Sequence, residues 1–386
     1  MRNPSFETGM DRILRRRIGA GQRVGLVSHV AAMTRKGFTA AEAWYRRSDS
    51  HLSALFSPEH GYFGSAGAGE AIRSIRFPHW QIPLHSLYGA RQEPSPAHLR
   101  GLSLLIFDLQ DLGARCYTYL STLVGVLRAA ARARLPLIVA DRPIPLPYLP
   151  DGPLLDPRFA SFVGLAPVPM ATAMTPAETA LYLQKVWDLN VDLEVVPMRG
   201  WPRTPYRGPD WPPWVPPSPG IRSWESAACY LATVFTEAVP TVTCDRTGLL
   251  PFQVFGAPWI KAPEVIPMLE AAHLPGVAFH VHPFRPNTGP WAGRLLSGVR
   301  LVITDPRRFR PVRLSVFILA TLQKQYGKNR LWANARPDFF DKLYGTDEVR
   351  LALLDGDPPA QIARRWEPGL RRFNHLRSSI LLYRPA

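Results

Sequence analysis

The sequence has few cysteines, no long apolar run and a shortage of acidic residues. Its three cysteines, Cys116, Cys229 and Cys244, lie far apart without a Cys-x-x-Cys pair, so we predict neither a disulfide framework nor a zinc knuckle. No apolar run approaches the roughly 20 residues that a membrane-spanning helix needs. The N-terminal segment is charged but has no apolar core, unlike a secretory signal. We therefore expect a cytoplasmic protein, and leave export by another route open.

Several catalytic signatures are also missing. The glycine-rich segment 19–25 looks like a dinucleotide-binding loop, but it precedes a strand and its glycine spacing is wrong. The chain has no Walker A lysine loop, no His-Glu-x-x-His motif and no Gly-x-Ser-x-Gly elbow. These absences argue against nucleotide, zinc-protease and serine-hydrolase chemistry. We expect neither a cofactor nor a metal ion.

Basic residues outnumber acidic ones. The chain has 46 lysines and arginines against 30 aspartates and glutamates, which gives a net charge of +16. Most of the excess is arginine, whose guanidinium binds carboxylate or phosphate in a bidentate manner. The arginines are scattered instead of gathered in one stripe among aromatic residues, so we expect no nucleic-acid partner. A surface that attracts anionic small molecules or polymers is the favoured interpretation.

The first half of the chain alternates short apolar runs with helical segments. A chain of 386 residues usually forms more than one domain. The expected strands cover residues 24–28, 52–56, 102–107, 135–140 and 193–196. A helix is expected over 117–134, and the pattern Thr175-Pro-Ala-Glu178 begins another with a capping box. This alternation predicts an α/β fold with a Rossmann-like, doubly wound, mostly parallel sheet.

The second half has a different character. Residues 201–220 include eight prolines and three tryptophans, which excludes a helix or a central strand. This segment is either an ordered linker around the first domain or an aromatic wall beside a pocket. A strand over 299–304, a helix over 312–326 and one or two helices over 359–382 predict a smaller α+β domain. We expect the catalytic domain to cover residues 1–238 and the smaller domain to cover 239–386.

Polar side chains follow four consecutive strands of the predicted sheet. The segment 55–70 is the most conspicuous, because a short apolar strand runs into Glu59, His60, Glu70 and several glycines. The other groups are Ser28 and His29, then Asp108, Gln110, Asp111 and Arg115, then Asp141 and Arg142. The carboxyl ends of parallel strands meet at one edge, where ligands of α/β sheets bind. Individually, Asp108 and Asp141 could instead cap the following helices, and Asp111 could pair with Arg115. Four such groups together favour a site.

The order of the sequence blocks resembles that of a known bacterial family. The blocks are FSPEHGYFG (56–64), AGE (68–70), SLYG (86–89), FDLQDLGARCYTY (107–119), DRP (141–143), DGPLLD (151–156), SFVG (161–164), PPSP (216–219) and PFQVFGAPW (251–259). From about residue 24 to 383, the chain resembles the exo-acting β-N-acetylmuramidases, long catalogued only as a domain of unknown function. The resemblance implies a Rossmann-like catalytic domain, a smaller C-terminal domain, and release of terminal N-acetylmuramic acid from peptidoglycan fragments.

Glycoside hydrolysis usually requires two carboxyl groups. We predict that Glu59 and Glu70 form this pair and that His60 orients or tunes Glu59. The 2-acetamido group of the substrate could itself be the nucleophile, and the sequence does not separate these schemes. The lactyl carboxylate of muramic acid calls for an arginine, with Arg115 and Arg142 as first candidates and Arg246 as the third. The predicted substrate-binding residues are Ser28, Asp108, Asp111, Arg115, Tyr117, Asp141, Arg142, Glu237 and Arg246.

Some positions depart from the family pattern. Ile144 stands where asparagine usually follows Asp141-Arg-Pro, and Asp245-Arg-Thr-Gly248 stands in place of a Gly-Arg-Gly-Thr loop. Ser65 occupies an acidic loop position. An alternative interpretation is therefore a catalytically altered or inactive homologue that binds cell-wall saccharides.

Overall fold

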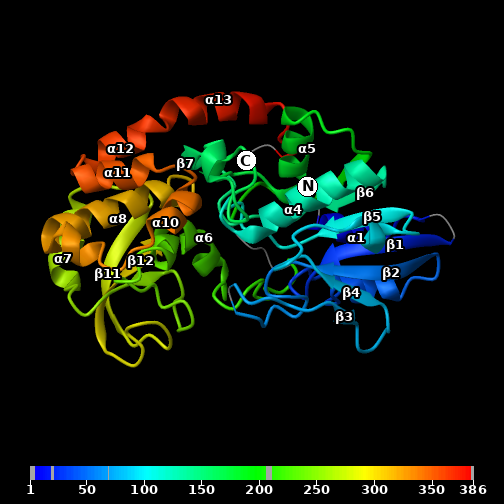
Figure 1. The fold of residues 1–386 in the computed structure, drawn as a ribbon, viewed down its shortest axis with the longest axis horizontal. Coiled ribbons are helices and arrows are strands. Elements are labelled where there is room, and N and C mark those ends of the chain that lie inside the picture. The colour runs from blue at the N-terminus through cyan, green and yellow to red at the C-terminus, as the bar shows by residue number, and fades with distance from the viewer. Residues whose placement is uncertain (1–4, 19–20, 68, 206–210, 384–386) are drawn as a thin grey trace.

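The computed structural model describes residues 5–18, 21–67, 69–205 and 211–383 (Figure 1). Gly19 and Ala20 of the glycine-rich segment, Ala68 of the Glu59 loop and residues 206–210 of the proline-rich segment lie outside the described residues. Figure 1 shows two lobes, one built around the N-terminal sheet and the other around a smaller sheet. Helix α13 lies along the edge that joins the lobes. No helix of the described residues is long and apolar enough to cross a membrane.

The first lobe contains a seven-stranded sheet in the order β3-β4-β2-β1-β5-β6-β9. All its pairings are parallel except that of the short edge strand β3. The strands are β1 (Gln22–Ser28), β2 (Ser50–Ser57), β3 (Ile75–Arg76), β4 (Pro83–Ser86), β5 (Leu104–Asp108), β6 (Leu137–Ala140) and β9 (Leu193–Val196). The doubly wound, mostly parallel sheet is thus confirmed. Strands β3 and β4 were not predicted, since β3 has only two residues and β4 has the sequence Pro-Leu-His-Ser, which is not an apolar run.

Helices cover both faces of this sheet because the strand side chains alternate between two apolar clusters. On β1, Val24 and Leu26 pack with helices α1 (Gly9–Ile13) and α2 (Ala40–Tyr45). Val27 of the same strand faces the other cluster, which includes α4 (Thr118–Ala133) and α5 (Pro176–Val186). Helix α3 (Pro96–Leu99) contacts α4. Helices α4 and α5 begin close to where the sequence predicted.

The second lobe has an antiparallel sheet in the order β10-β12-β11 and most of the remaining helices. Its strands are β10 (Val254–Phe255), β11 (Val277–Phe284) and β12 (Leu296–Ile303). Helix α8 (Pro311–Tyr326) contacts α6 (Trp224–Thr233), α7 (Ala262–Glu270), α9 (Lys328–Leu331), α11 (Glu348–Asp355) and α12 (Pro359–Arg365). Helix α10 (Pro337–Tyr344) precedes α11, and α13 (Glu367–Ser378) follows α12 as the last helix. The predicted smaller α+β domain is confirmed.

The two lobes share one hydrophobic core, which includes Val27 of the sheet and Val312 of α8. A two-stranded ribbon, β7 (Asp151–Leu154) with β8 (Pro169–Ala171), lies where they join, together with the 3₁₀ helix η1 (Pro157–Phe159). The carboxylate of Asp151 accepts hydrogen bonds from the backbone N–H groups of Val312 and Arg313 at the start of α8. A division of the chain at residue 238 stays a prediction.

The proline-rich segment contains no helix or strand in its described parts, 201–205 and 211–220, as its composition predicts. Trp201 and Trp211 pack in a small cluster with Phe6 and Tyr383, and Trp214 contacts the ring of Trp224. The rings therefore hold the segment onto the protein. Its contribution to the cavity described next comes from Ser218 and Gly220.

Candidate active site

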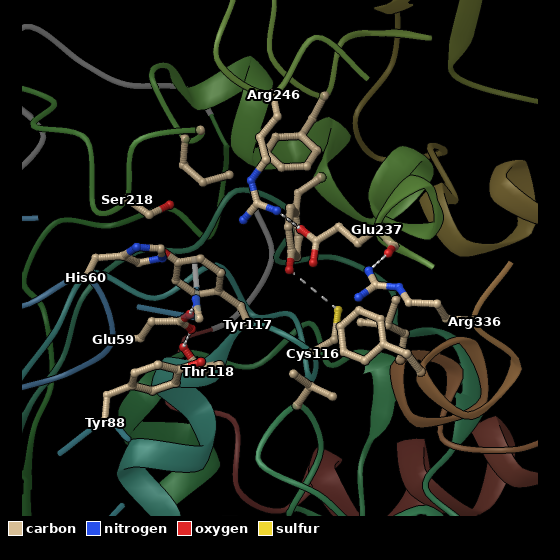
Figure 2. Close-up of a pocket in the computed structure, with 18 residues that line it drawn as sticks. Glu59, His60, Tyr88, Cys116, Tyr117, Thr118, Ser218, Glu237, Arg246 and Arg336 are labelled. Atoms are coloured by element: carbon tan, nitrogen blue, oxygen red, sulfur yellow. Dashed lines mark hydrogen bonds and ion pairs between the residues drawn. The ribbon is translucent and has the colours of Figure 1, made fainter. Parts of the chain in front are cut away.

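A cavity of about 370 Å³ lies between the lobes, where β2 ends and α4 begins (Figure 2). Its walls come from segments far apart in the sequence, since the sheet supplies one side and the second lobe the other. The lining residues are Glu59, His60, Gly69, Tyr88, Cys116, Tyr117, Thr118, Val163, Ser218, Gly220, Ile221, Tyr230, Glu237, Arg246, Phe252, Arg336, Phe339 and Leu343.

Glu59 is held in a fixed position on the sheet side of the cavity. It follows β2 by two residues and its side chain is buried, with only 7% exposure. The hydroxyl of Thr118, the first residue of α4, donates a hydrogen bond of 2.7 Å to one carboxylate oxygen. The backbone N–H of Gly69 donates one of 2.9 Å to the other oxygen. These two hydrogen bonds fix the orientation of the Glu59 carboxylate against the start of α4.

His60 turns the chain immediately after Glu59. Its backbone has φ of 69°, in the left-handed region that residues with a Cβ seldom adopt, and Gly61 follows with φ of 75°. The ring Nδ1 lies 2.8 Å from the carbonyl oxygen of Ala66, which can only accept, so Nδ1 carries the proton. Burial lowers the pKa of His60, although the Ala66 carbonyl and Glu59 oppose the shift. The neutral ring thus has Nε2 available as an acceptor.

Glu237 lies on the opposite side of the cavity, at the end of the 3₁₀ helix η2 (Val234–Glu237). Figure 2 shows it beside Arg246 and Arg336, across the cavity from Glu59. Arg246 donates a hydrogen bond of 2.5 Å to its carboxylate, and Arg336 donates to its backbone carbonyl. Desolvation raises the pKa of Glu237, Arg246 lowers it, and the nearby Glu59 raises it further. This second carboxyl group therefore holds a proton more readily than an ordinary glutamate.

Tyrosine hydroxyl groups complete the polar lining. Burial raises the pKa of Tyr88 to about 12 and raises that of Tyr117 as well. Tyr230 is buried, and its hydroxyl lies 3.9 Å from the sulfur of Cys116. Neutral hydroxyls that both donate and accept suit the hydroxyl and acetamido groups of a sugar.

Five of the predicted site residues line the cavity, namely Glu59, His60, Tyr117, Glu237 and Arg246. Glu70, the predicted partner of Glu59, does not. Its side chain is exposed, and its carboxylate accepts a hydrogen bond of 2.8 Å from the N–H of Gly67 in its own loop. The second carboxyl group of the cavity is Glu237, which was predicted only as a substrate ligand.

The carboxylates at the ends of β5 and β6 bind partners inside the protein and do not line the cavity. Asp108 forms a buried ion pair with Arg142, so neither group faces the cavity. Asp141 accepts hydrogen bonds from the Thr175 hydroxyl and the Ala177 N–H at the start of α5, as a helix cap does. The capping alternative therefore describes Asp141, and Arg142 is not free to bind a lactyl group.

Three further predicted residues are also buried outside the cavity lining. Arg115 is fully buried and donates to the backbone carbonyls of Pro153, Val168, Leu343 and Tyr344. Asp111 accepts from the N–H of Gly113, and the ion pair with Arg115 is absent among the described contacts. Ser28 is completely buried at the end of β1. All three side chains are buried, and none of them lines the cavity.

The polar cavity residues that the sequence analysis did not predict as site residues include Tyr88, Thr118, Ser218 and Arg336. The first three lie inside the blocks SLYG, FDLQDLGARCYTY and PPSP, which was the available signal. Arg336 carries no local signal, since it reaches the cavity only through the path of the chain between α9 and α10. Among the described residues, no group of three or more His, Cys, Asp or Glu side chains could hold a metal ion.

Comparison with known proteins gives consistent matches along the chain. Residues 24–225 match the family model described as "Exo-beta-N-acetylmuramidase NamZ, N-terminal", and residues 228–383 match its C-terminal counterpart. The chain is 34% identical to the peptidoglycan β-N-acetylmuramidase NamZ of Bacillus subtilis strain 168, over 99% of this chain and 92% of that protein.

Solved structures match over nearly the whole chain. A crystal structure of a DUF1343 family protein from Bacteroides fragilis superimposes with a TM-score of 0.91 at 26% identity, covering 98% of this chain and 99% of that chain. A second DUF1343 protein of that organism gives a TM-score of 0.76 at 26% identity, covering 99% and 100%.

Proposed function

This chain belongs to the NamZ family of exo-β-N-acetylmuramidases, and from that premise we propose that it is a glycosidase whose cavity binds and releases terminal N-acetylmuramic acid from peptidoglycan fragments. The observation that carries the proposal is the pair of carboxyl groups in one cavity, Glu59 with two hydrogen-bond donors and Glu237 opposite it. Two carboxyl groups in unlike environments are what acid and base roles require.

We assign Glu59 the role of the base, the nucleophile, or the group that orients the substrate's acetamido nitrogen, because two hydrogen-bond donors fix its carboxylate on the sheet side of the cavity. The Nε2 atom of His60 can accept a hydrogen bond from the sugar beside it. The configuration of the released sugar distinguishes these schemes, because direct attack by water inverts the anomeric carbon and the two-step routes retain it.

Glu237 is the corresponding general acid. Because its pKa is raised, the carboxyl group of Glu237 can hold the proton that the leaving oxygen needs. In the free protein Arg246 binds the carboxylate of Glu237 and opposes protonation. When the lactyl carboxylate of the substrate binds Arg246, it partly neutralises this cation. The pKa of Glu237 then rises further, so binding of a muramic acid substrate favours the protonated form that the general acid requires.

Arg246 and Arg336 are the arginines for the lactyl carboxylate. Both line the cavity on the Glu237 side, and Figure 2 shows their guanidinium groups on either side of that glutamate. Arg246 is partly buried and Arg336 lies at the exposed rim. Guanidinium groups bind carboxylates through short charge-assisted hydrogen bonds. N-acetylglucosamine has no lactyl group, so it forgoes this interaction.

The first test replaces Glu59. We expect Glu59→Gln to lower kcat on a 4-nitrophenyl β-glycoside of N-acetylmuramic acid by about 10³-fold or more, because the amide has no charge to offer. Glu237→Gln should lower kcat less on this substrate than on a natural glycan, because nitrophenolate leaves without much help from an acid.

Glu70→Gln is the matched control, since Glu70 belongs to the same loop but is exposed and outside the cavity. It should keep nearly the wild-type rate. Thermal unfolding of all three variants checks that the fold is intact. Near-normal turnover by a folded Glu59→Gln variant would refute the assignment.

The second test concerns sugar preference. We expect Arg246→Gln and Arg336→Gln each to reduce kcat/KM on the N-acetylmuramic acid glycoside roughly 10- to 100-fold, and to change the N-acetylglucosamine glycoside much less. Arg132→Gln, on the exposed surface of α4, serves as the control because its side chain pairs only with Glu93 among the described contacts. Equal losses on both glycosides would contradict lactyl recognition.

The loop Asp245-Arg-Thr-Gly248, which departs from the family pattern, bears on the alternative of an inactive saccharide-binding homologue. Asp245 adopts a left-handed backbone with φ of 52°, and a Cβ at Gly248 would overlap its carboxylate. Asp245 and Gly248 thus fit each other, and Arg246 between them still lines the cavity. The release assay separates the two functions, since saccharide binding without product would support the inactive homologue.

A further inference from the structure

A second hollow lies in the C-terminal lobe, outside the cavity of Glu59. It has a volume of about 940 Å³, within the range of ligand pockets. Its most distinctive lining residues are Trp259, Trp291 and Tyr326, accompanied by Asn329, Lys328 and Arg330. The described lining includes no acidic residue.

The aromatic rings of this hollow are held in place by the surrounding protein. The ring of Trp259 packs edge-on against Tyr326 at a centroid distance of 5.2 Å. The indole N–H of Trp291 donates a hydrogen bond of 3.2 Å to the carbonyl of Thr241, and the Tyr326 hydroxyl accepts from the N–H of Lys261 at 3.0 Å. All three rings remain partly exposed. Fixed, partly exposed rings provide apolar faces at little entropic cost.

Two chain segments, residues 237–241 and 330–336, connect this hollow with the active-site cavity. Hydrogen bonds join them side by side, from Arg336 N–H to the carbonyl of Ala238 at 2.8 Å and from the Thr241 hydroxyl to the carbonyl of Leu331 at 2.5 Å. At one end these segments present Glu237 and Arg336 to the active-site cavity. At the other end they present Thr241 and Arg330 to the second hollow. Glu237 and Thr241 are four residues apart, and four residues of extended chain span at most about 14 Å. The two cavities therefore lie within the length of a glycan of a few sugars.

We propose that the second hollow binds the leaving-group side of the glycan, which comprises the N-acetylated sugars beyond the terminal muramic acid. This inference rests on the proposed function, because that function makes Glu237 the residue nearest the leaving oxygen. The apolar faces of the sugar rings lie on Trp259 and Trp291, and the asparagine amides bind their acetamido groups. Lys328 and Arg330 lie near the lactyl carboxylates that recur along the chain.

The consequence is a dependence on chain length. The 4-nitrophenyl glycoside places only its terminal sugar in the active-site cavity, whereas a glycan of four or more alternating sugars extends into the second hollow. We expect Trp259→Ala, and separately the double variant Lys328→Ala with Arg330→Ala, to lower kcat/KM on the longer glycan roughly tenfold more than on the glycoside. This ratio corresponds to about 1.4 kcal/mol.

Trp80→Ala is the matched control. Trp80 also stacks on other aromatic rings, Tyr45 and Phe77, but it belongs to the first lobe and lines neither cavity. It should leave the ratio of the two substrates unchanged. The double variant removes only exposed side chains, so it keeps the test valid if Trp259→Ala proves unstable.

Calorimetric binding of the same glycan to the Glu59→Gln protein gives a readout that does not need turnover. Weaker binding after the second-hollow substitutions, with the substrate ratio lowered, supports the inference. An unchanged ratio and unchanged affinity in folded variants overturn it while leaving the proposed function intact. Failure of the wild-type protein to cleave either substrate overturns the proposed function instead, and the binding measurement still decides whether the hollow holds the glycan.

Discussion

At the scale of single residues, Glu59 and Glu70 show how neighbours in one loop acquire different chemistry. Glu59 is buried and receives hydrogen bonds from Thr118 and Gly69, whereas Glu70 is exposed and receives one from Gly67. Both glutamates follow the same strand and both are surrounded by glycines in the sequence. One donor to Glu59 comes from α4, a segment about sixty positions away, and Glu70 has no such long-range hydrogen bond among the described contacts.

Asp111 gives a residue-scale prediction about pH. Burial raises the pKa of its carboxyl group to about 7, compared with an ordinary value of 3.8. The folded protein therefore keeps the proton between about pH 4 and 7, where the unfolded chain has already lost it. Asp111 consequently lowers the free energy of unfolding as pH rises through this window, by about 1.4 kcal/mol per pH unit at most.

Asp111→Asn removes this titration. We expect the free energy of unfolding of the variant, measured relative to wild type by urea denaturation, to be clearly higher at pH 8 than at pH 4.5. Asp156→Asn is the control, because Arg158 lowers the pKa of this partly exposed carboxylate and the variant should gain no stability at pH 8. A relative stability of Asp111→Asn that does not change with pH would disprove the buried titration.

At the scale of secondary-structure elements, the ends of the strands decide which polar groups reach the cavity. The turn after β2 bends sharply, because His60 and Gly61 both have positive φ, and this places Glu59 beside α4. The ends of β5 and β6 are instead covered by chain that follows, so Asp108 pairs with Arg142 and Asp141 caps α5. Groups at equivalent strand ends thus divide between the cavity lining and the protein interior.

At the scale of the whole molecule, the cavity depends on how the two lobes are joined. Arg115 extends from the connection between β5 and α4 and donates to backbone carbonyls of β7 and of α10. Gly345 approaches its guanidinium so closely that a Cβ there would overlap it. At the end of the chain, Arg377 of α13 donates to the carbonyl of Ala173 in the first lobe. These contacts hold Arg336 and Phe339 opposite Glu59.

We therefore expect Arg115→Met to lower the free energy of unfolding by about 3 kcal/mol or more, because it leaves several buried carbonyl groups without donors. Chemical denaturation followed by tryptophan fluorescence measures the loss. Arg132→Met provides the comparison, since its ion pair with Glu93 is exposed and such pairs contribute less than about 1 kcal/mol. Similar small losses for both variants would contradict a role of Arg115 in joining the lobes.

Local patterns in the sequence were sufficient for most of the fold. Short apolar runs marked the central strands, and the capping box at Thr175 marked the start of α5, because burial of apolar side chains and capping of backbone groups act over a few residues. The order of the blocks also indicated the family, and Glu59 stood out where a strand ran into polar residues.

Which residues line the cavity was decided only by the tertiary structure. Whether a polar group faces a cavity or pairs inside the core depends on partners far away in the sequence, such as Tyr383 with Asp141 or Thr118 with Glu59. Arg336 reaches the cavity from almost three hundred positions beyond Glu59, and no local pattern records that path. The sequence by itself thus determined the family and the sheet, and it singled out one glutamate that lines the cavity. Long-range packing placed Glu237, and not Glu70, in the cavity with Glu59, because packing sets which side chains are desolvated together.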